Sequence, residues 1–399
     1  MLISPKWAMP ALPSSLISSL SQAPPITVPQ SAAGLPEALA CLPDPRARRG
    51  VRHRLTVVVS AAVCAVVAGS RSYAAIAEWV ADAPAATVAA LGMDPDRRPS
   101  EAMIRRLLQA LDPDLLTAAI SGWLAGRLAT GQPSRSTRRA IAVDGKTLRG
   151  SRSGDTAARH VLAALDQSTG VVLASTDVDG KTNEITRFQP LLDQIDDLHD
   201  TVVTIDALHC QRDHVAYLAE RGAHWIVTVK ANQPSVHAQL AALPWQAVPQ
   251  ATREAGRGHG RREIRTLKIL TVATGIGFPY AAQALQIRRR RRRLDQPNRF
   301  TTETVYAITD LRVQQARPDQ LAACIRGHWS IENKLHWVRD VTYDEDRSQV
   351  RTRSGPQVMA VLRNAAIGIL RLTGVTNIAA ANRHHARDST RPLALLGIT

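Results

Sequence analysis

The hydrophobic residues of positions 35–130 recur with the period of an α-helix. Residues 55–69, LTVVVSAAVCAVVAG, are apolar throughout but too few to cross a bilayer, so they predict a buried helix. Residues 72–82 and 100–112 predict two amphipathic helices, and Ser100 is placed to cap the second. The pattern therefore predicts an all-helical N-terminal domain. Residues 1–34 are rich in Ser, Pro and Ala and predict a flexible leader.

After a polar linker at 131–138, the pattern changes to short runs rich in β-branched residues. AIAVDG predicts a strand that ends at Asp144, and HVLAALD and VVLASTDVD predict a hairpin around QSTG. TVVTID and HWIVTVK predict two further strands, each preceded by a helical pattern. Three strands, a helix, a strand, a helix and a strand form the order of a ribonuclease-H-like core. We therefore predict an α/β fold with a mixed five-stranded sheet, whose first part is 139–230.

Residues 231–310 interrupt the alternation with Gly-rich and Arg-rich stretches and short strand candidates, and they predict a β-rich insertion. The run Arg288–Arg293 lies in this insertion. Such a run is typical of a solvated face or a loop, and we expect it to be mobile in isolation. Residues 311–399 predict a long helix that carries Glu332, followed by helices that complete the core.

Charge narrows the class of partner. The chain has 50 Lys and Arg against 34 Asp and Glu, a net charge of +16. Within 251–300 there are 13 Lys and Arg against 3 Asp and Glu, a balance of +10. This excess favours a polyanionic partner, of which nucleic acid is the commonest. The four cysteines have no C-x-x-C spacing, which argues against a zinc ribbon or a disulfide scaffold and fits a reducing cytoplasm.

Three carboxylates are the candidate chemistry. Asp144 and Asp206 stand where predicted strands end, and Glu332 lies on the long predicted helix. Asp206 follows Asp144 by 62 residues, and Glu332 follows Asp206 by 126. The first interval fits a hairpin and a helix, and the second fits the insertion. Hard oxygen ligands are what two Mg²⁺ ions need for phosphoryl transfer, so the trio predicts a two-metal site.

Other residues compete for these roles. Asp340, Asp344, Glu345 and Asp346 follow Glu332 closely and could hold metal in its place. Glu184 could be an auxiliary ligand, although an acidic residue in a first helical turn also favours the helix dipole. His209 and His214 with Cys210 lack the spacing of a four-ligand zinc site. Trp329 and Trp337 could stack on an exposed base or pack against the long helix.

Five segments carry a family resemblance. They are LPDPRARRGVRHRL, IAVDGKTLRGS, DVDGKTNEI, TIDALHCQ and HWSIENKLHWVRDVTYDEDRSQVR. The chain resembles DDE transposases of the insertion-sequence ISAs-one family, which includes the H-repeat-associated proteins, from about residue 35 onwards. The broader group carries a Tyr-x-x-Arg-x-x-x-Glu-x₆-Lys signature. In this sequence Ile325 and His328 stand in its first two places, Glu332 is kept, and Arg339 stands in the last.

The resemblance implies that Asp144, Asp206 and Glu332 are the catalytic metal ligands, with Mg²⁺ or Mn²⁺ as cofactor. It implies cleavage and strand transfer at the ends of an insertion sequence. The implied partners are double-stranded DNA of the terminal inverted repeats and target, and a second copy of the chain in a homodimer or larger assembly. A bacterial, cytoplasmic, nucleoid-associated protein with no membrane role is expected. The expected DNA contacts are Lys146, Arg149, His328, Arg339, Arg288, Arg289, Arg290, Arg291, Arg292 and Arg293.

Two alternatives remain open at the level of sequence. The N-terminal helical domain at 35–130 could bind DNA ends, or it could serve in dimerisation or packing. The whole chain could be a nuclease without strand transfer, or a decayed or domesticated relative that only binds DNA.

Overall fold

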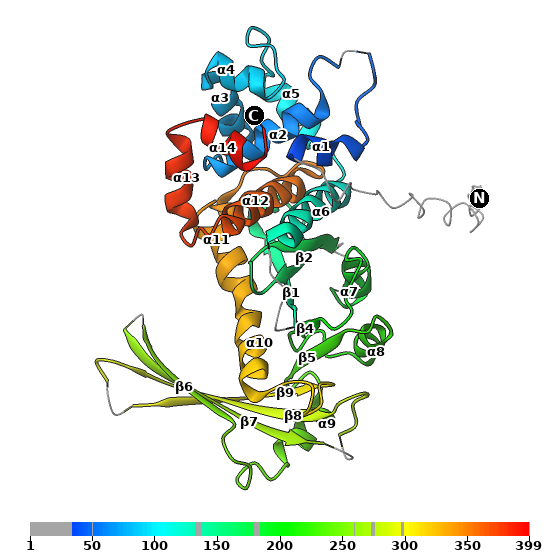
Figure 1. Ribbon diagram of the computed structural model, residues 1–399, viewed down its shortest axis with the longest axis vertical. Helices are drawn as coiled ribbons and strands as arrows, with labels where there is room; N and C mark the ends of the chain where they lie inside the picture. Colours follow the sequence, from blue (N-terminus) through cyan, green and yellow to red (C-terminus); the bar gives the residue numbers. More distant parts are fainter. Residues whose placement is uncertain are drawn as a thin grey trace, which may run out of the picture.

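The computed structural model describes residues 34–49, 51–131, 138–178, 184–258, 260–272, 276–296 and 299–398. The predicted leader lies outside this range except for Gly34, and the linker lies outside it except for its two end residues. The chain is elongated and has three tiers (Figure 1). Helices from both ends of the sequence form one tier, a mixed sheet lies in the middle, and a long four-stranded extension forms the far tier.

The N-terminal tier is helical, as the hydrophobic period predicts. Ser72 and Ser100 cap two of its helices by accepting hydrogen bonds from Ala75 N and Met103 N. In the described part of the chain, no helix is both long and apolar enough to cross a membrane. The helices are α1 (Leu35–Ala38), α2 (Leu55–Val67), α3 (Tyr73–Asp82), α4 (Ala85–Ala90), α5 (Glu101–Leu108) and α6 (Pro113–Gly131), with a 3₁₀ turn at Leu39–Cys41.

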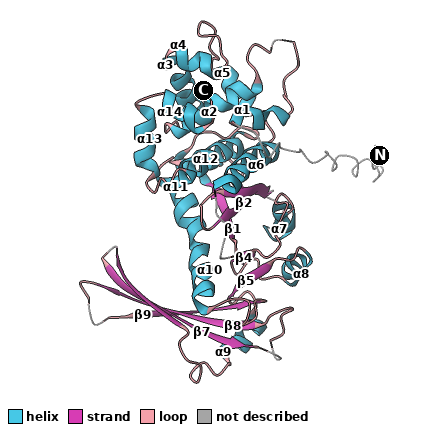
Figure 2. Ribbon diagram, viewed as in Figure 1, coloured by secondary structure: helices cyan, strands magenta, loops and turns pink. Residues whose placement is uncertain are grey.

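The middle tier contains the five strands expected from the sequence. They run in the order β3-β2-β1-β4-β5. β2 pairs antiparallel with both β1 and β3, β4 pairs parallel with β1, and β5 pairs parallel with β4. Helices α7 and α8 lie beside this sheet (Figure 2). The elements are β1 (Ala140–Leu148), β2 (Arg159–Asp166), β3 (Val172–Val178), α7 (Glu184–Leu192), β4 (Val202–Ile205), α8 (Arg212–Glu220) and β5 (His224–Val229), with a 3₁₀ turn at Arg149–Ser151.

The sheet has nine strands, so the predicted number of five is wrong. The insertion continues the sheet because β9 pairs antiparallel with β5, which would otherwise leave an open edge. The full order is β3-β2-β1-β4-β5-β9-β8-β7-β6. The added elements are α9 (Pro234–Ala241), β6 (Thr252–Gly258), β7 (Arg261–Thr271), β8 (Gln283–Arg293) and β9 (Thr301–Thr309).

The arginine run forms a regular strand, so of the two structures that its charge left open, a solvated face and a loop, the loop is wrong. Arg288–Arg293 are the second half of β8, which pairs with β7 on one side and, through Arg291, with β9 on the other. Charge alone could not choose between a solvated face and a loop, because the cross-strand partners of β8 lie far away in the sequence. The hydrogen bonds of two ladders and the side-chain partners described below offset the like-charge repulsion.

The helix that carries Glu332 joins the tiers. It consists of α10 (Pro318–Ile331), a π-helical turn (Glu332–His336) and α11 (Trp337–Val341). Gly327 lets α10 lie close to the sheet, because a Cβ at this position would clash with the side chain of Gln167. The chain then continues through a 3₁₀ turn (Glu345–Arg347), α12 (Gly355–Leu372), α13 (Ile378–Ala386) and α14 (Thr390–Leu395).

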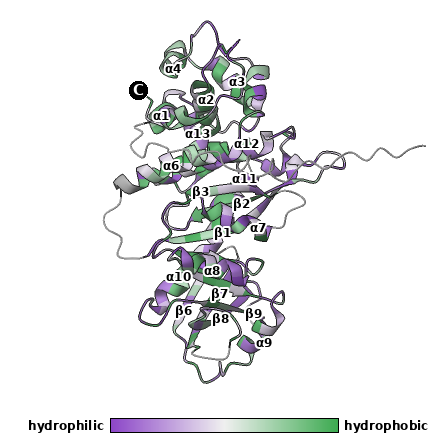
Figure 3. Cartoon of the chain, turned by 90° about the vertical axis from the view of Figure 1, so that its right-hand side faces the viewer, coloured by the Kyte–Doolittle hydropathy of each residue, from purple (hydrophilic) through white to green (hydrophobic). Residues whose placement is uncertain are grey.

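One hydrophobic core unites the two ends of the chain. Every residue of α12 from Gly355 to Leu370 is buried, and α12 packs against α2 and α6. Buried residues of the N-terminal helices, of α12 and of β3 belong to the same cluster. Figure 3 shows hydrophobic colouring where α2, α6 and α12 meet. The N-terminal helices therefore cover an apolar surface of the C-terminal ones, which is what the packing alternative for 35–130 requires.

Candidate active site

Asp144 lies in the middle of β1, opposite Ala163 of β2, and does not end the strand as predicted. Alternate residues of β1 face opposite sides of the sheet. Ala142 packs in the core shared with α12, and Lys146 bonds Asp340 of α11, so Asp144 faces the C-terminal helices with them. Its side chain is 29 % exposed.

Asp206 directly follows β4, as predicted. β1 and β4 are parallel neighbours with Val143 opposite Ile205, so Asp144 and Asp206 are the next residues along adjacent strands. Asp206 Oδ1 accepts the backbone N–H groups of Leu208 and His209 at 3.0 and 3.4 Å. These bonds fix the carboxylate at the strand end.

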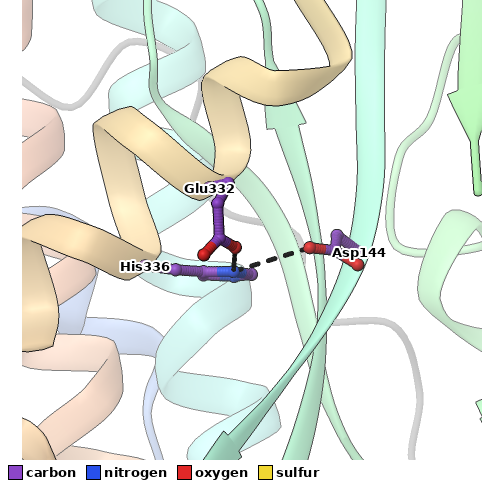
Figure 4. Close-up of side chains that lie close together, drawn as sticks. All are labelled: Asp144, Glu332 and His336. Carbon is purple, nitrogen blue, oxygen red and sulfur yellow. Dashed lines mark hydrogen bonds and ion pairs between the residues drawn. The ribbon is translucent and has the colours of Figure 1, made fainter. Parts of the chain in front are cut away.

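Glu332 is the first residue of the π-helical turn, and its side chain points towards the ring of His336 (Figure 4). His336, four residues later, lies between the two carboxylates. Its Nδ1 is 3.2 Å from Glu332 Oε2 and 3.6 Å from Asp144 Oδ2. One ligand atom from each of these three residues lies within 4.8 Å of the others. Sequence reasoning missed His336, although its position at i+4 from Glu332 was a signal for it.

A cavity of about 370 Å³ unites the candidate residues. Asp144, Asp206 and Glu332 all line it, with one wall from α10 and another from strands β6 to β9. Asp206 shares the cavity but is not part of the tight group formed by Asp144, Glu332 and His336. The insertion sheet thus forms one wall of the cavity that the three carboxylates line.

The carboxylates repel one another. Burial and the nearby charge of Asp206, with smaller effects from Glu332 and Glu184, raise the pKa of Asp144 to about 7. The hydrogen bond from His336 lowers the pKa of Glu332. Burial lowers the pKa of His336, which favours a neutral ring. The group therefore holds excess negative charge that a cation would offset.

Two of the residues expected to contact DNA have protein partners. Lys146 is 9 % exposed, and its Nζ donates to Asp340 Oδ2 at 2.7 Å. His328 Nδ1 lies 3.1 Å from Thr204 Oγ1, and burial lowers the pKa of this imidazole. Arg149 remains 77 % exposed, 3.4 Å from Asp346, and is free to reach outwards. Their DNA contacts stay predictions, and Arg149 has the most favourable position for one.

Arg339 is fully buried, so it is not placed to make the expected DNA contact. Its guanidinium bonds Glu345 at 2.8 Å, and Arg363 bonds the same carboxylate at 2.8 Å. Seven residues span about two turns of an ideal α-helix, which would put Arg339 near the same face as Glu332. The wider π-helical turn between Glu332 and Arg339 rotates the later residues away from the face of Glu332.

The competing carboxylates are engaged elsewhere. Asp340 pairs with Lys146, and Glu345 is enclosed by two arginines. Asp344 lies 3.9 Å from Arg347, and Asp346 lies 3.4 Å from Arg149. Among the residues that the structure describes, the single cluster with metal-binding spacing is Asp144, Glu332 and His336.

Glu184 lies behind the site, on the other face of β1. Its carboxylate is 2.7 Å from His160 Nε2 and 3.5 Å from His209 Nε2. These two imidazoles lower the pKa of Glu184 to about 2. A Cβ at Gly145 would lie 2.5 Å from Glu184 Oε2, so the glycine after Asp144 allows this close approach.

The remaining candidates from the sequence differ in exposure. They are His214, Cys210, Trp329 and Trp337. The His214 ring stacks on Phe188 at 4.1 Å, and burial lowers its pKa to about 4. Within the described ranges, no group of three potential ligands includes His214 or Cys210. Trp329 and Trp337 are 57 % and 56 % exposed, so packing against the long helix does not account for them. Trp329 borders the cavity.

A family model described as "Transposase DDE domain" matches residues 135–369, and a second model associated with that domain matches residues 36–124. The chain belongs to the DDE transposase family. The first match includes Asp144, Asp206 and Glu332. The resemblance noted from the sequence motifs is therefore confirmed.

Two curated relatives cover most of this transposase chain. "Putative transposase YncI" of Escherichia coli O157:H7 is 27 % identical over 359 residues, which are 84 % of this chain and 86 % of the relative. "H repeat-associated putative transposase YhhI" of Escherichia coli K12 is 25 % identical over 351 residues, 84 % of this chain and 90 % of the relative.

A solved structure, a piggyBac transposase synaptic complex with hairpin DNA, matches at a TM-score of 0.40 and 10 % identity. The match covers 86 % of this chain and 72 % of that chain.

Proposed function

We propose that this chain cleaves DNA at the ends of an insertion sequence and joins those ends to target DNA, with Asp144, Asp206 and Glu332 as ligands of Mg²⁺ or Mn²⁺. The observation that carries the proposal is the convergence of the three carboxylates on one cavity from two adjacent parallel strands and one helix. The spacing of these residues in the sequence does not by itself require such a convergence.

We assign the first five strands to a ribonuclease-H-like core. The support is the order β3-β2-β1-β4-β5 with three antiparallel strands followed by two parallel to β1. The four strands of the insertion lie between β5 and the helix of Glu332 in the sequence and beyond β5 in the sheet. The insertion strands that line the cavity can then change in sequence without altering β1 and β4, which position the two aspartates.

The donor set fits a hard divalent cation. Carboxylate oxygens are the preferred ligands of Mg²⁺ and Mn²⁺, and neutral imidazole is an acceptable additional one. In the described chain, Asp144, Asp206 and Glu332 form no ion pair with a lysine or arginine. His336 Nε2 is buried and has no hydrogen-bond partner among the described residues. The unbalanced charge of the three carboxylates favours a cation in the cavity that they line.

Some residues of the chain serve as metal ligands, and others position those ligands or the DNA. When bound, the divalent cation supplies an activated water or hydroxyl and neutralises the leaving oxygen. Neutral His336 donates a hydrogen bond from Nδ1 to Glu332 and so orients its carboxylate. Lys146 ties β1 to α11 through Asp340, which holds Asp144 and Glu332 at a fixed separation. Arg149, exposed at the end of β1, contacts a DNA phosphate.

DNA is the proposed substrate, and a homodimer or larger assembly is the proposed active form. Family membership and the net charge of +16 support DNA binding. Strand transfer requires two DNA ends to be held together, which favours more than one copy of the chain. The proposed location is the bacterial cytoplasm, at the nucleoid.

The test is cleavage and joining of a duplex that carries the ends flanking the gene. Wild type is compared with Glu332→Gln, and Asp344→Asn serves as a matched control because this neighbouring carboxylate does not line the cavity. We expect Glu332→Gln to lose both activities by at least about 10²-fold, since a ligand to a catalytic metal is worth several kcal/mol. Fluorescence anisotropy would establish that DNA binding is retained.

The outcomes separate the alternatives. Cleaved ends without joined products would identify a nuclease. A wild type that binds DNA and never cuts it would identify a decayed or domesticated copy. Full activity in Glu332→Gln would contradict the assignment of the third ligand.

A further inference from the structure

Strand register divides the insertion sheet into two faces. Directly opposite residues of paired strands share a face, and successive residues alternate. The inner face lines the cavity and packs on α10 through Leu267, Leu285 and Ala307. The outer face lies on the opposite side. Near the core it is covered by α9 and Trp245, which stacks on Tyr306.

Four of the five arginines of the inner face, all except Arg261, have acidic partners within the chain. Arg289 and Arg265 both bond Glu263, at 2.9 and 2.5 Å. Arg291 bonds Glu303 at 2.8 Å. Arg293 bonds Asp295 in the adjoining turn at 2.7 Å. Half of the six-arginine run is thus neutralised by partners within the chain.

The strands of the outer face contribute arginine side chains but no acidic side chains. By register, its charged strand positions in the far half of the sheet are Arg253, Arg257, Arg262, Arg288, Arg290 and Arg292, and none of its strand positions is Asp or Glu. Arg290 and Arg292 stack over Phe300, at 4.6 and 5.2 Å from its ring centre. Arg253, Arg257, Arg288 and Arg290 are exposed, and these four form no salt bridge with the described residues.

We propose that this outer face, termed the arginine face and defined by those six residues, docks the phosphate backbone of a target duplex. A target duplex must be accepted whatever its sequence, and arginine–phosphate contacts hold DNA without reading bases. The face is on the opposite side of the sheet from the cavity. The stretch of target duplex docked there lies outside the cavity, so the phosphate that the element end attacks at Asp144 and Glu332 belongs to another stretch of the same target duplex. This inference rests on the proposed strand-transfer function.

The strand geometry suits a repeating anion. Alternate residues of one strand are about 6.8 Å apart, so Arg288, Arg290 and Arg292 span roughly 14 Å. Because β8 is paired with both neighbours over most of its length, the array is held in place before DNA binds. The far end of the sheet extends clear of α10 and of the middle tier, where a duplex can approach it (Figure 1).

The first measurement is the salt dependence of binding to a labelled duplex of unrelated sequence, without divalent metal. Arg288→Gln/Arg290→Gln removes two arginines of the arginine face. Arg291→Gln/Arg293→Gln removes two from the acid-paired side of the same strand. Arg312→Gln/Arg317→Gln removes the same charge from an exposed loop outside the sheet.

We expect the first variant to reduce the slope of log K against log salt by about 2, since each lost phosphate contact contributes roughly 0.9. The other two variants should change it by less than half as much. Equal losses in the Arg288/Arg290 and Arg291/Arg293 variants would overturn the proposal, as would an unchanged slope in the first. Stronger binding of an RNA duplex than of DNA would also overturn it.

The second measurement tests whether two duplexes bind at once. Wild type is first saturated with an unlabelled element-end duplex, and the labelled unrelated duplex is then titrated. Retained binding that Arg288→Gln/Arg290→Gln abolishes supports the proposal. Exclusion of the second duplex by the first overturns it. Neither measurement needs cleavage, so a chain that never cuts DNA would contradict the proposed function by a separate result.

Discussion

At the scale of single residues, Glu345 shows how a charge can be buried beside the site. Its carboxylate is 1 % exposed and bonds Arg339 and Arg363, each at 2.8 Å. The two guanidinium groups outweigh the cost of burial and lower its pKa from the ordinary 4.5 to about 2. The three side chains join α11, the following 3₁₀ turn and α12. They therefore support the helix that presents Glu332.

Glu345→Gln should destabilise the fold by about 3–5 kcal/mol, because it leaves two buried guanidinium groups without their counter-charge. Asp344→Asn, at an exposed neighbouring carboxylate, should change stability by less than about 0.5 kcal/mol. Urea denaturation followed by far-UV circular dichroism measures both. An equal effect of the two substitutions would show that Glu345 is not the structural charge inferred here.

The same interaction predicts a pH dependence. The folded pKa of Glu345 is depressed, so its contribution to stability is fully present above about pH 4.5 and is lost as pH falls towards 2. The unfolding free energy of wild type should fall over this range more steeply than that of Glu345→Gln. Parallel curves for the two proteins would contradict the assignment.

Some residues of the candidate site could be identified from the sequence, and others could not. Asp144, Asp206 and Glu332 could be chosen from their types, their intervals and the family motifs, and all three line the cavity. His336 was missed because a lone histidine on a helix has many ordinary explanations. The position of Arg339 could not be predicted, because one π-helical turn changes the helix face of every later residue. No residue type in the sequence indicates such a turn.

At the scale of elements, β8 is the strand whose structure was hardest to predict from its sequence. The charge of its second half is typical of a solvated face or a loop, and the structure places it in a strand between two partner strands. The five core strands were predictable because their hydrophobic runs are local signals. The pairing of β5 with β9 joins residues about eighty positions apart, and local patterns carry no information on such contacts.

Hydrogen–deuterium exchange tests the new assignment of β8. The amides of residues 288–291 should exchange at least about tenfold more slowly than those of the exposed turn at 294–296, since they lie in a strand with partners on both sides. Peptides from these two segments can be compared in one experiment without DNA. Equally fast exchange in both would restore the mobile loop that the charge pattern suggested.

At the scale of the whole molecule, the two ends of the chain meet in one core while the middle of the chain forms the catalytic sheet and its extension. The core shared by the N-terminal helices and α12 anchors one end of the helix with Glu332, and the insertion sheet packs against its other end. The family motifs located the catalytic segments, but only the folded chain brings residues 144, 206 and 332 to one cavity. Catalysis by the proposed mechanism therefore depends on metal binding in that cavity.

A metal-specificity switch at Asp144 tests this most directly. Mg²⁺ requires oxygen ligands, whereas Mn²⁺ tolerates sulfur better. Asp144→Cys should lose Mg²⁺-dependent cleavage of element-end DNA and regain at least a tenth of wild-type cleavage in Mn²⁺. Asp144→Ala, which offers no ligand, should stay inactive in both. A folded, DNA-binding Asp144→Cys that is inactive in both metals, or fully active in Mg²⁺, would contradict metal ligation by Asp144.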